Sequence, residues 1–81
     1  TKPVRLAAEL ASPDEWHIGF GAVAGDDNLS SGADLAEAAA KLYEALHRAD
    51  ASDRAAIAVA PIPQHGIGVA LNDRLQRAAA R

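Results

Sequence analysis

Residues 55–75, AAIAVAPIPQHGIGVALNDRL, place an apolar segment directly before an amphipathic one. The apolar segment is short, contains the β-branched residues Ile57 and Val59, and ends at Pro61, which is typical of a strand covered on both faces. From about Gly66 onward, apolar residues recur at helical spacing on one face: Ile67, Leu71, Leu75 and Ala78. A buried strand that leads into a helix predicts an α/β fold.

A longer helix is predicted upstream, beginning after Asp34. Asp34 and Glu37 have the spacing of a capping box, in which the first side chain accepts from a free amide and the second reaches back. Glu37 can also pair with Lys41, four residues further on. The apolar positions of this helix form one stripe: Leu35, Ala39, Leu42, Leu46 and Ala49.

Two strands are predicted before this helix, in residues 3–10 (PVRLAAEL) and residues 16–23 (WHIGFGAV). The largest apolar groups of the second segment share one face: Trp16, Ile18 and Phe20. His17 falls on the opposite face, where we expect it to be exposed. Residues 11–15 are predicted as a turn too short for a parallel crossover, so the two strands, if they are neighbours, should be antiparallel. Residues 24–32 are predicted as a loop.

The expected order of elements is therefore strand, strand, helix, strand, helix, in a single domain of residues 1–81. The helix between the second and third strands allows these two strands to be parallel, with a right-handed crossover. We expect a small α/β sheet of about three strands with two helices and at least one parallel pair.

Composition limits the functions open to the chain. Its 81 residues make one small domain, and although 49% are apolar, many of these are alanine, so the core must be modest and the domain is expected to rest against a partner. A net charge of −3, with mixed signs along the chain, argues against direct nucleic-acid binding. Scattered histidines and the lack of cysteine argue against a metal site. We expect no membrane association, a cytoplasmic location and, without a nucleophile motif, no self-contained catalytic site.

Gly66, Ile67 and Gly68 form the candidate site, since glycines between a strand and a helix can let a phosphate approach free amides. The lysine of a P-loop and the third glycine of a dinucleotide motif are both missing. The glycines can equally relieve strain in the turn and let the helix pack closely on the sheet. Asn72 and Arg74 can face a partner domain or solvent. Three functions stay open: an interdomain module, a free-standing nucleotide- or anion-binding module, and a self-associating scaffold that forms a homodimer.

Three segments carry a family resemblance: residues 28–50 (NLSSGADLAEAAAKLYEALHRAD), 56–63 (AIAVAPIP) and 66–81 (GIGVALNDRLQRAAAR). Together they resemble the C-terminal domain of the long, two-domain form of threonylcarbamoyl-AMP synthase, in which a Gly-[Leu/Ile]-Gly-x-Ala-[Ile/Leu]-Asn-Asp-Arg-Leu-x-Arg-Ala-Ala segment follows an apolar strand. The resemblance extends over essentially the whole chain. We therefore expect the chain to be a fragment that lacks a catalytic domain.

The resemblance implies a small Rossmann-like α/β domain that supports a YrdC-like catalytic domain of the same polypeptide. The catalytic domain would bind threonine, bicarbonate and ATP, with magnesium, and make threonylcarbamoyl-adenylate with release of pyrophosphate. This product feeds the N6-threonylcarbamoyl modification of adenosine 37 in tRNA. No cofactor is implied for the present domain. The positions carried over as nucleotide or interdomain contacts are Gly66, Ile67, Gly68, Asn72 and Arg74.

Two departures from the family pattern change what is expected. Gln64 and His65 stand where many relatives have glutamate and threonine, so no role of an acid before Gly66 can be carried over. Many relatives also have an extra helix and strand after the first strand, for which residues 11–15 leave no room. We therefore expect a smaller sheet than in those members.

Overall fold

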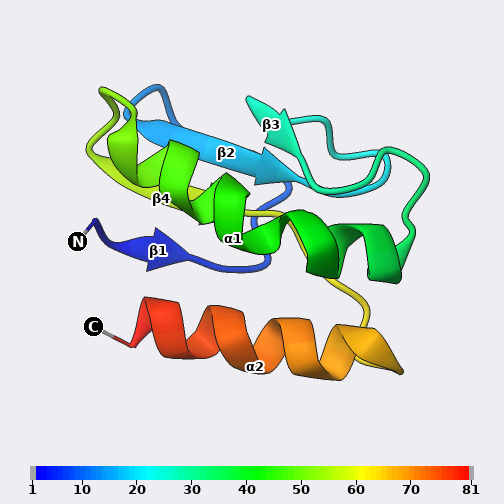
Figure 1. Cartoon of the computed structure of the whole chain (residues 1–81). Helices are drawn as coiled ribbons and strands as arrows, with labels where there is room; N and C mark the ends of the chain where they lie inside the picture. The colour runs from blue at the N-terminus through cyan, green and yellow to red at the C-terminus, as the bar shows by residue number, and fades with distance from the viewer. Residues whose placement is uncertain (1, 81) are drawn as a thin grey trace.

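The computed structural model describes residues 2–80, which form a parallel sheet and a layer of two helices (Figure 1). The elements are β1 (Val4–Arg5), β2 (Glu15–Gly19), β3 (Asp27–Asn28), α1 (Leu35–Ala51), β4 (Ala56–Val59) and α2 (Ile67–Ala79). The strand order is β1-β4-β2-β3, and every pairing is parallel. The predicted α/β class, the two helices and the parallel pairing of β2 with β4 are confirmed.

β4 lies between β1 and β2 in the sheet. Residues 57–60 are buried, as the unbroken apolar run predicted. The two N-terminal strands are consequently not neighbours, and the antiparallel pairing considered for them does not form. The physical reason is that β1 ends at Arg5, so residues 6–14 connect it to β2, and this connection is long enough to cross the sheet.

The predicted loop over residues 24–32 contains the short strand β3, which is a correction to the sequence-based expectation. β3 pairs with the end of β2. The side-chain amide of Asn28 donates to the Val23 carbonyl oxygen at 3.1 Å, and Asp27 is ion-paired with Arg48 of α1 at 2.7 Å. These contacts hold turn-type residues in an extended conformation. The sheet therefore has four strands instead of about three.

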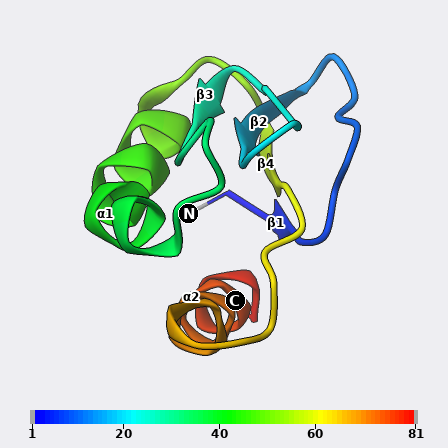
Figure 2. The same cartoon turned by 90° about the vertical axis from the view of Figure 1, so that its right-hand side faces the viewer.

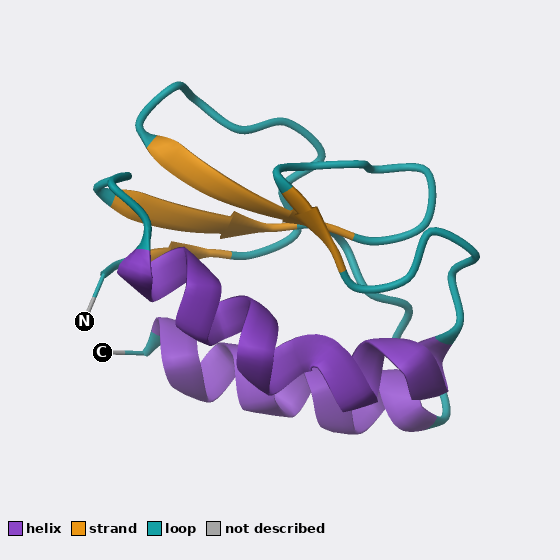
Figure 3. Ribbon diagram, turned by 45° about the horizontal axis from the view of Figure 1, so that its top comes forward, coloured by secondary structure: helices purple, strands orange, loops and turns teal. Residues whose placement is uncertain are grey.

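Both helices lie on the same face of the sheet (Figures 2 and 3). α1 begins after Asp34, whose carboxylate accepts from the N–H groups of Ala36 and Glu37, so the predicted N-cap is confirmed. Glu37 does not reach back directly, because its carboxylate accepts from the Ser30 hydroxyl at 2.6 Å. That hydroxyl in turn accepts from the Asp34 N–H at 2.9 Å. The Ser30 side chain therefore completes the cap, and the predicted Glu37–Lys41 ion pair is also present, at 2.9 Å.

The core between the sheet and the helices is built largely from short side chains. On α1 the buried residues are Ala38, Leu42, Ala45 and Ala49. On α2 they are Gly68, Leu71 and Leu75. The predicted stripe of α1 is thus slightly rotated, with Ala38 buried and Ala39 exposed. Alanine at these contacts allows close approach of α1 to the sheet but contributes little apolar area, as the composition predicted.

Residues 6–14 cross the opposite face of the sheet (Figure 2). The Ala8 N–H donates to the Val59 carbonyl oxygen at 2.8 Å, which fixes this segment over β4. His17 lies on this face, but it is only 8% exposed. The prediction that His17 is exposed is therefore wrong, because strand alternation shows which face a side chain takes and does not show what covers that face.

An ion pair between Arg5 and Glu15 anchors this segment. The Glu15 carboxylate accepts from the Arg5 guanidinium at 2.7 and 3.0 Å and from the Ser12 N–H at 2.9 Å. The hydrogen bond from Arg5, followed by that from the Ser12 amide, lowers the pKa of Glu15 from 4.5 to about 2. Since the folded-state pKa lies below that of the unfolded chain, the contribution of Glu15 to stability is present above about pH 4.5 and is lost as the pH falls towards 2.

We expect a Glu15→Gln variant to show a flatter decline in the free energy of unfolding between about pH 4.5 and pH 2 than the unchanged chain. Glutamine keeps the size of the side chain but cannot change its charge in this range. Urea unfolding at a series of pH values measures the effect. Glu44→Gln, on the exposed side of α1, is the control and should keep the original slope. Equal slopes in the two variants would contradict the assignment.

Candidate functional site

The junction between β4 and α2 holds the glycines that the sequence singled out. Gly66 is the N-cap of α2, with φ 55° and ψ −131°, a conformation that favours glycine. Gly68 is buried in the first turn, and a Cβ added there would lie 1.9 Å from the Pro63 carbonyl oxygen. Both glycines therefore have a structural reason to be present. Their role in ligand binding stays a prediction.

The polar groups at this junction largely bond to one another. The Gly68 N–H donates to the His65 carbonyl oxygen at 2.9 Å, and the Val69 N–H donates to that of Gly66 at 3.2 Å. The side-chain amide of Asn72 donates to the carbonyl oxygens of Ile62 at 3.0 Å and of Gly68 at 2.9 Å. Asn72 thus ties the end of the sheet to the start of α2. Fewer amides remain for an anion than the glycine spacing suggested.

Arg74 and Ile67 do not lie at the glycine junction. They lie on α2 at the solvent-exposed margin of its contact with α1. α1 and α2 run side by side there (Figure 3). Two hollows of about 450 and 430 Å³ follow the seam between the helices, and Arg74 and Tyr43 line both of them. We call this surface the helix groove; its lining includes Ala39, Tyr43, Leu46, Ile67, Ala70, Arg74 and Ala78.

The helix groove combines exposed apolar groups with one free cation. Tyr43 is 65% exposed and Ile67 is 46% exposed. The Tyr43 ring meets the His47 ring edge-on at 4.6 Å. The Arg74 side chain makes no ion pair or hydrogen bond with any of residues 2–80. Tyrosine and arginine are enriched where proteins contact each other, so this groove is suited to a protein partner.

The structure brings only part of the predicted site together. Ile67 and Arg74 share the helix groove, whereas Gly66, Gly68 and Asn72 do not line it. Tyr43 was missed as a site residue, because it comes from the other helix. Its signal in the sequence was weak: an aromatic residue on the polar side of an amphipathic helix.

Two kinds of site are not found in the part of the chain that the structure describes. Among residues 2–80, no group of three histidine, aspartate or glutamate side chains lies close enough to hold a metal ion. Neither helix of this region combines the length and the apolar character needed to cross a bilayer.

These features define a small parallel α/β domain with a partly apolar groove between its two helices. The family model described as the C-terminal domain of threonylcarbamoyl-AMP synthase matches residues 3–80. The chain belongs to this family, which confirms the resemblance seen in the sequence and implies a YrdC-like partner domain in the same polypeptide. Neither a search of curated proteins nor a search of solved structures gave a match.

Proposed function

We propose that this domain is an accessory module of threonylcarbamoyl-AMP synthase that docks on the catalytic domain and contributes no catalytic group. The family match over residues 3–80 carries the proposal. Threonine, bicarbonate and ATP, with magnesium, then bind to the catalytic domain, where threonylcarbamoyl-adenylate forms and pyrophosphate leaves. The product serves the modification of adenosine 37 of tRNA in the cytoplasm. The present domain binds no cofactor and does not contact the tRNA.

The helix groove is the surface that we assign to the catalytic domain. Ile67 and Tyr43 offer apolar area there, and Arg74 offers a guanidinium that is not used within residues 2–80. A guanidinium has five donors in a fixed fork, which suits carboxylates and carbonyl oxygens on a partner. The small alanine-rich core also limits the stability of the domain alone, so contacts with a neighbouring domain would add to it.

Arg74→Ala is expected to weaken docking by about 1–2 kcal/mol, which is the range for a contributing interface arginine. In the two-domain protein, pyrophosphate release from ATP, threonine and bicarbonate should slow. Arg77→Ala is the matched control, because Arg77 lies on the same helix, is 80% exposed, pairs with Asp73 and does not line the groove. Equal rates for the two variants would remove the assignment of the groove. Concentration-dependent sedimentation that Arg74→Ala abolishes would instead assign the groove to a homodimer.

A second candidate, a nucleotide- or anion-binding module, is favoured by one observation. Gly66 caps α2 without any side-chain hydrogen bond, so the start of the helix is not closed by a capping group. Titration of the chain with ATP, AMP and pyrophosphate, followed by amide shifts in NMR spectra, separates the two candidates. Saturable shifts confined to Gly66 and Gly68 would support the second candidate. Silent spectra would favour the interdomain module.

A further inference from the structure

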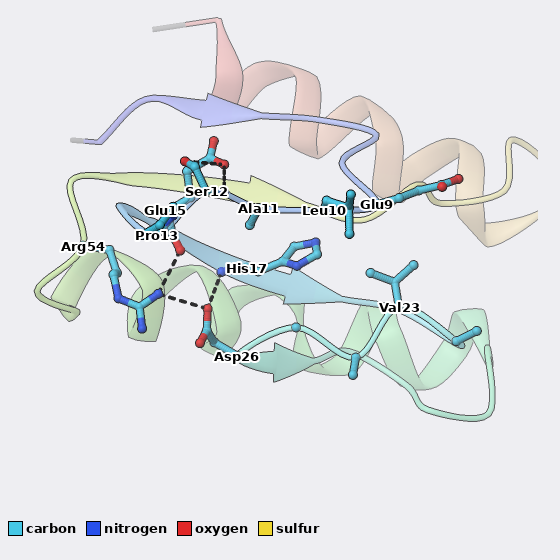
Figure 4. Close-up of a pocket in the computed structure, with 13 residues that line it drawn as sticks. Glu9, Leu10, Ala11, Ser12, Pro13, Glu15, His17, Val23, Asp26 and Arg54 are labelled. Atoms are coloured by element: carbon cyan, nitrogen blue, oxygen red, sulfur yellow. Dashed lines mark hydrogen bonds and ion pairs between the residues drawn. The ribbon is translucent and has the colours of Figure 1, made fainter.

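A shallow cleft of about 750 Å³ lies on the sheet face opposite the helices, between residues 9–13 and residues 22–26 (Figure 4). It is separate from the helix groove and does not rest on the function proposed for that groove. Its walls combine apolar with polar and charged side chains, and Leu10 on one wall is 83% exposed. A single exposed leucine says little, so the polar groups of the cleft decide what it can bind.

His17 is the polar group on the floor of this cleft. It comes from the middle of β2 and is 8% exposed, and its Nε2 lies 2.8 Å from the Ala8 carbonyl oxygen. Because a carbonyl oxygen only accepts, Nε2 carries the hydrogen, and Nδ1 of the neutral ring is an acceptor. Nδ1 has no partner in residues 2–80 and keeps access to the cleft. Nδ1 is open to the cleft, so it can accept a hydrogen bond from a donor that binds there.

The charged groups around the cleft are paired, with one exception. Glu15 is held by the ion pair described above. Asp26 pairs with Arg54 at 3.3 Å and accepts from the backbone N–H of His17 at 2.9 Å. Glu9, in contrast, has no ion pair or hydrogen bond with residues 2–80. In Figure 4, Arg54 and Asp26 lie at one end of the cleft, Glu9 lies at the other, and His17 lies between them.

We propose that this cleft binds an extended segment of another polypeptide that carries a lysine or arginine side chain. A backbone N–H of the segment donates to Nδ1 of His17, an apolar side chain packs on Leu10 and Val23, and the cation faces Glu9. An extended chain fits, because it offers N–H groups and side chains in alternation along an open surface. A phosphate does not fit, because Glu9 repels it and the guanidinium of Arg54 is already bonded within the domain.

The test uses two capped dipeptides, N-acetyl-leucyl-lysine methylamide and N-acetyl-leucyl-glutamate methylamide, titrated into the 81-residue chain. Amide shifts in NMR spectra report where each probe binds. The lysine probe should shift the amides of Leu10, Val23 and Gly25, with an apparent Kd about fivefold lower than that of the glutamate probe at low salt. Butylammonium, which has the charge without the peptide, should bind more weakly and leave the Val23 amide unshifted.

Two variants assign the contacts. Glu9→Gln should make the two dipeptides bind equally, and His17→Gln, which keeps a donor near Ala8 but removes the ring acceptor, should weaken the lysine probe by about fivefold. Glu44→Gln removes an exposed acid from α1 and should change neither titration. Equal binding of both dipeptides to the unchanged chain, shifts confined to the helix groove, or no saturable shift at millimolar probe would each overturn the proposal. Butylammonium binding as tightly as the lysine probe would overturn the assignment to a polypeptide.

Discussion

A Gly68→Ala variant is expected to unfold at a temperature roughly 10 °C or more below that of the unchanged chain, as measured by circular dichroism. The new Cβ would lie 1.9 Å from the carbonyl oxygen of Pro63 and 3.0 Å from its carbonyl carbon. These are backbone atoms, which cannot swing aside as the end of a long side chain can. Overpacking costs of about 1–3 kcal/mol, and occasionally more, then outweigh the better helix propensity of alanine.

Two other glycines separate the causes of this effect. Gly32 has open space around its Cβ position and an ordinary backbone conformation, so Gly32→Ala should leave the midpoint nearly unchanged. Gly66 also has open space, but its φ is 55°, so Gly66→Ala should lose about 1–2 kcal/mol through backbone strain alone. Gly68→Ala should be the least stable of the three. If Gly68→Ala proved as stable as Gly32→Ala, this result would contradict the close contact between α2 and the residues that connect it to β4.

The elements that local signals specify could be predicted from the sequence. Asp34 predicted where α1 begins, and the spacing of Leu42 and Ala49 predicted its buried face. The β-branched residues of β4 predicted a strand buried on both faces. The order of the strands in the sheet, and the segments that cover its faces, could not be predicted from such local signals. β3 forms because Asp27 meets Arg48 of α1, a contact between residues 21 positions apart. His17 is buried because the Ala8 segment folds over it, which no pattern within β2 reveals.

The same distinction between local signals and tertiary packing applies to the candidate site. The sequence indicates Gly68 and Asn72, but their contacts with Pro63 and Ile62 are contacts within the domain. The sequence also indicates Arg74. The surroundings of Arg74 include Tyr43 of the other helix, and no local sequence pattern connects these two residues. The sequence motif therefore identified residues whose surroundings restrict the side chain that can stand there. Which of those environments are internal and which face a partner required the packing of α1 on α2.

A second large effect is expected on the rate of pyrophosphate release. The 81-residue chain alone is expected to release no pyrophosphate from ATP, threonine and bicarbonate above the uncatalysed background, whereas the two-domain protein should exceed that background by several orders of magnitude. Phosphoryl and nucleotidyl chemistry depends on positioned cations and amides around the phosphates. In this domain, Arg5, Arg48 and Arg54 are paired with internal carboxylates, and the Gly68 and Val69 amides in the first turn of α2 donate to nearby carbonyl oxygens. Pyrophosphate release by the chain alone, sensitive to omission of threonine, would overturn the accessory role.

Adding the chain back in trans to a separately made catalytic domain tests the same idea from the other side. A flexible connection between two domains gives an effective concentration in the millimolar range, so an interface that suffices within one polypeptide can be too weak between two. Stimulation should therefore rise with the concentration of added chain and need a higher concentration for Arg74→Ala than for Arg77→Ala. A catalytic domain that reaches the rate of the two-domain protein without the added chain would show that docking has no part in turnover. In that case neither the helix groove nor the cleft on the opposite side of the sheet would contribute to turnover, and the proposed accessory role would be wrong.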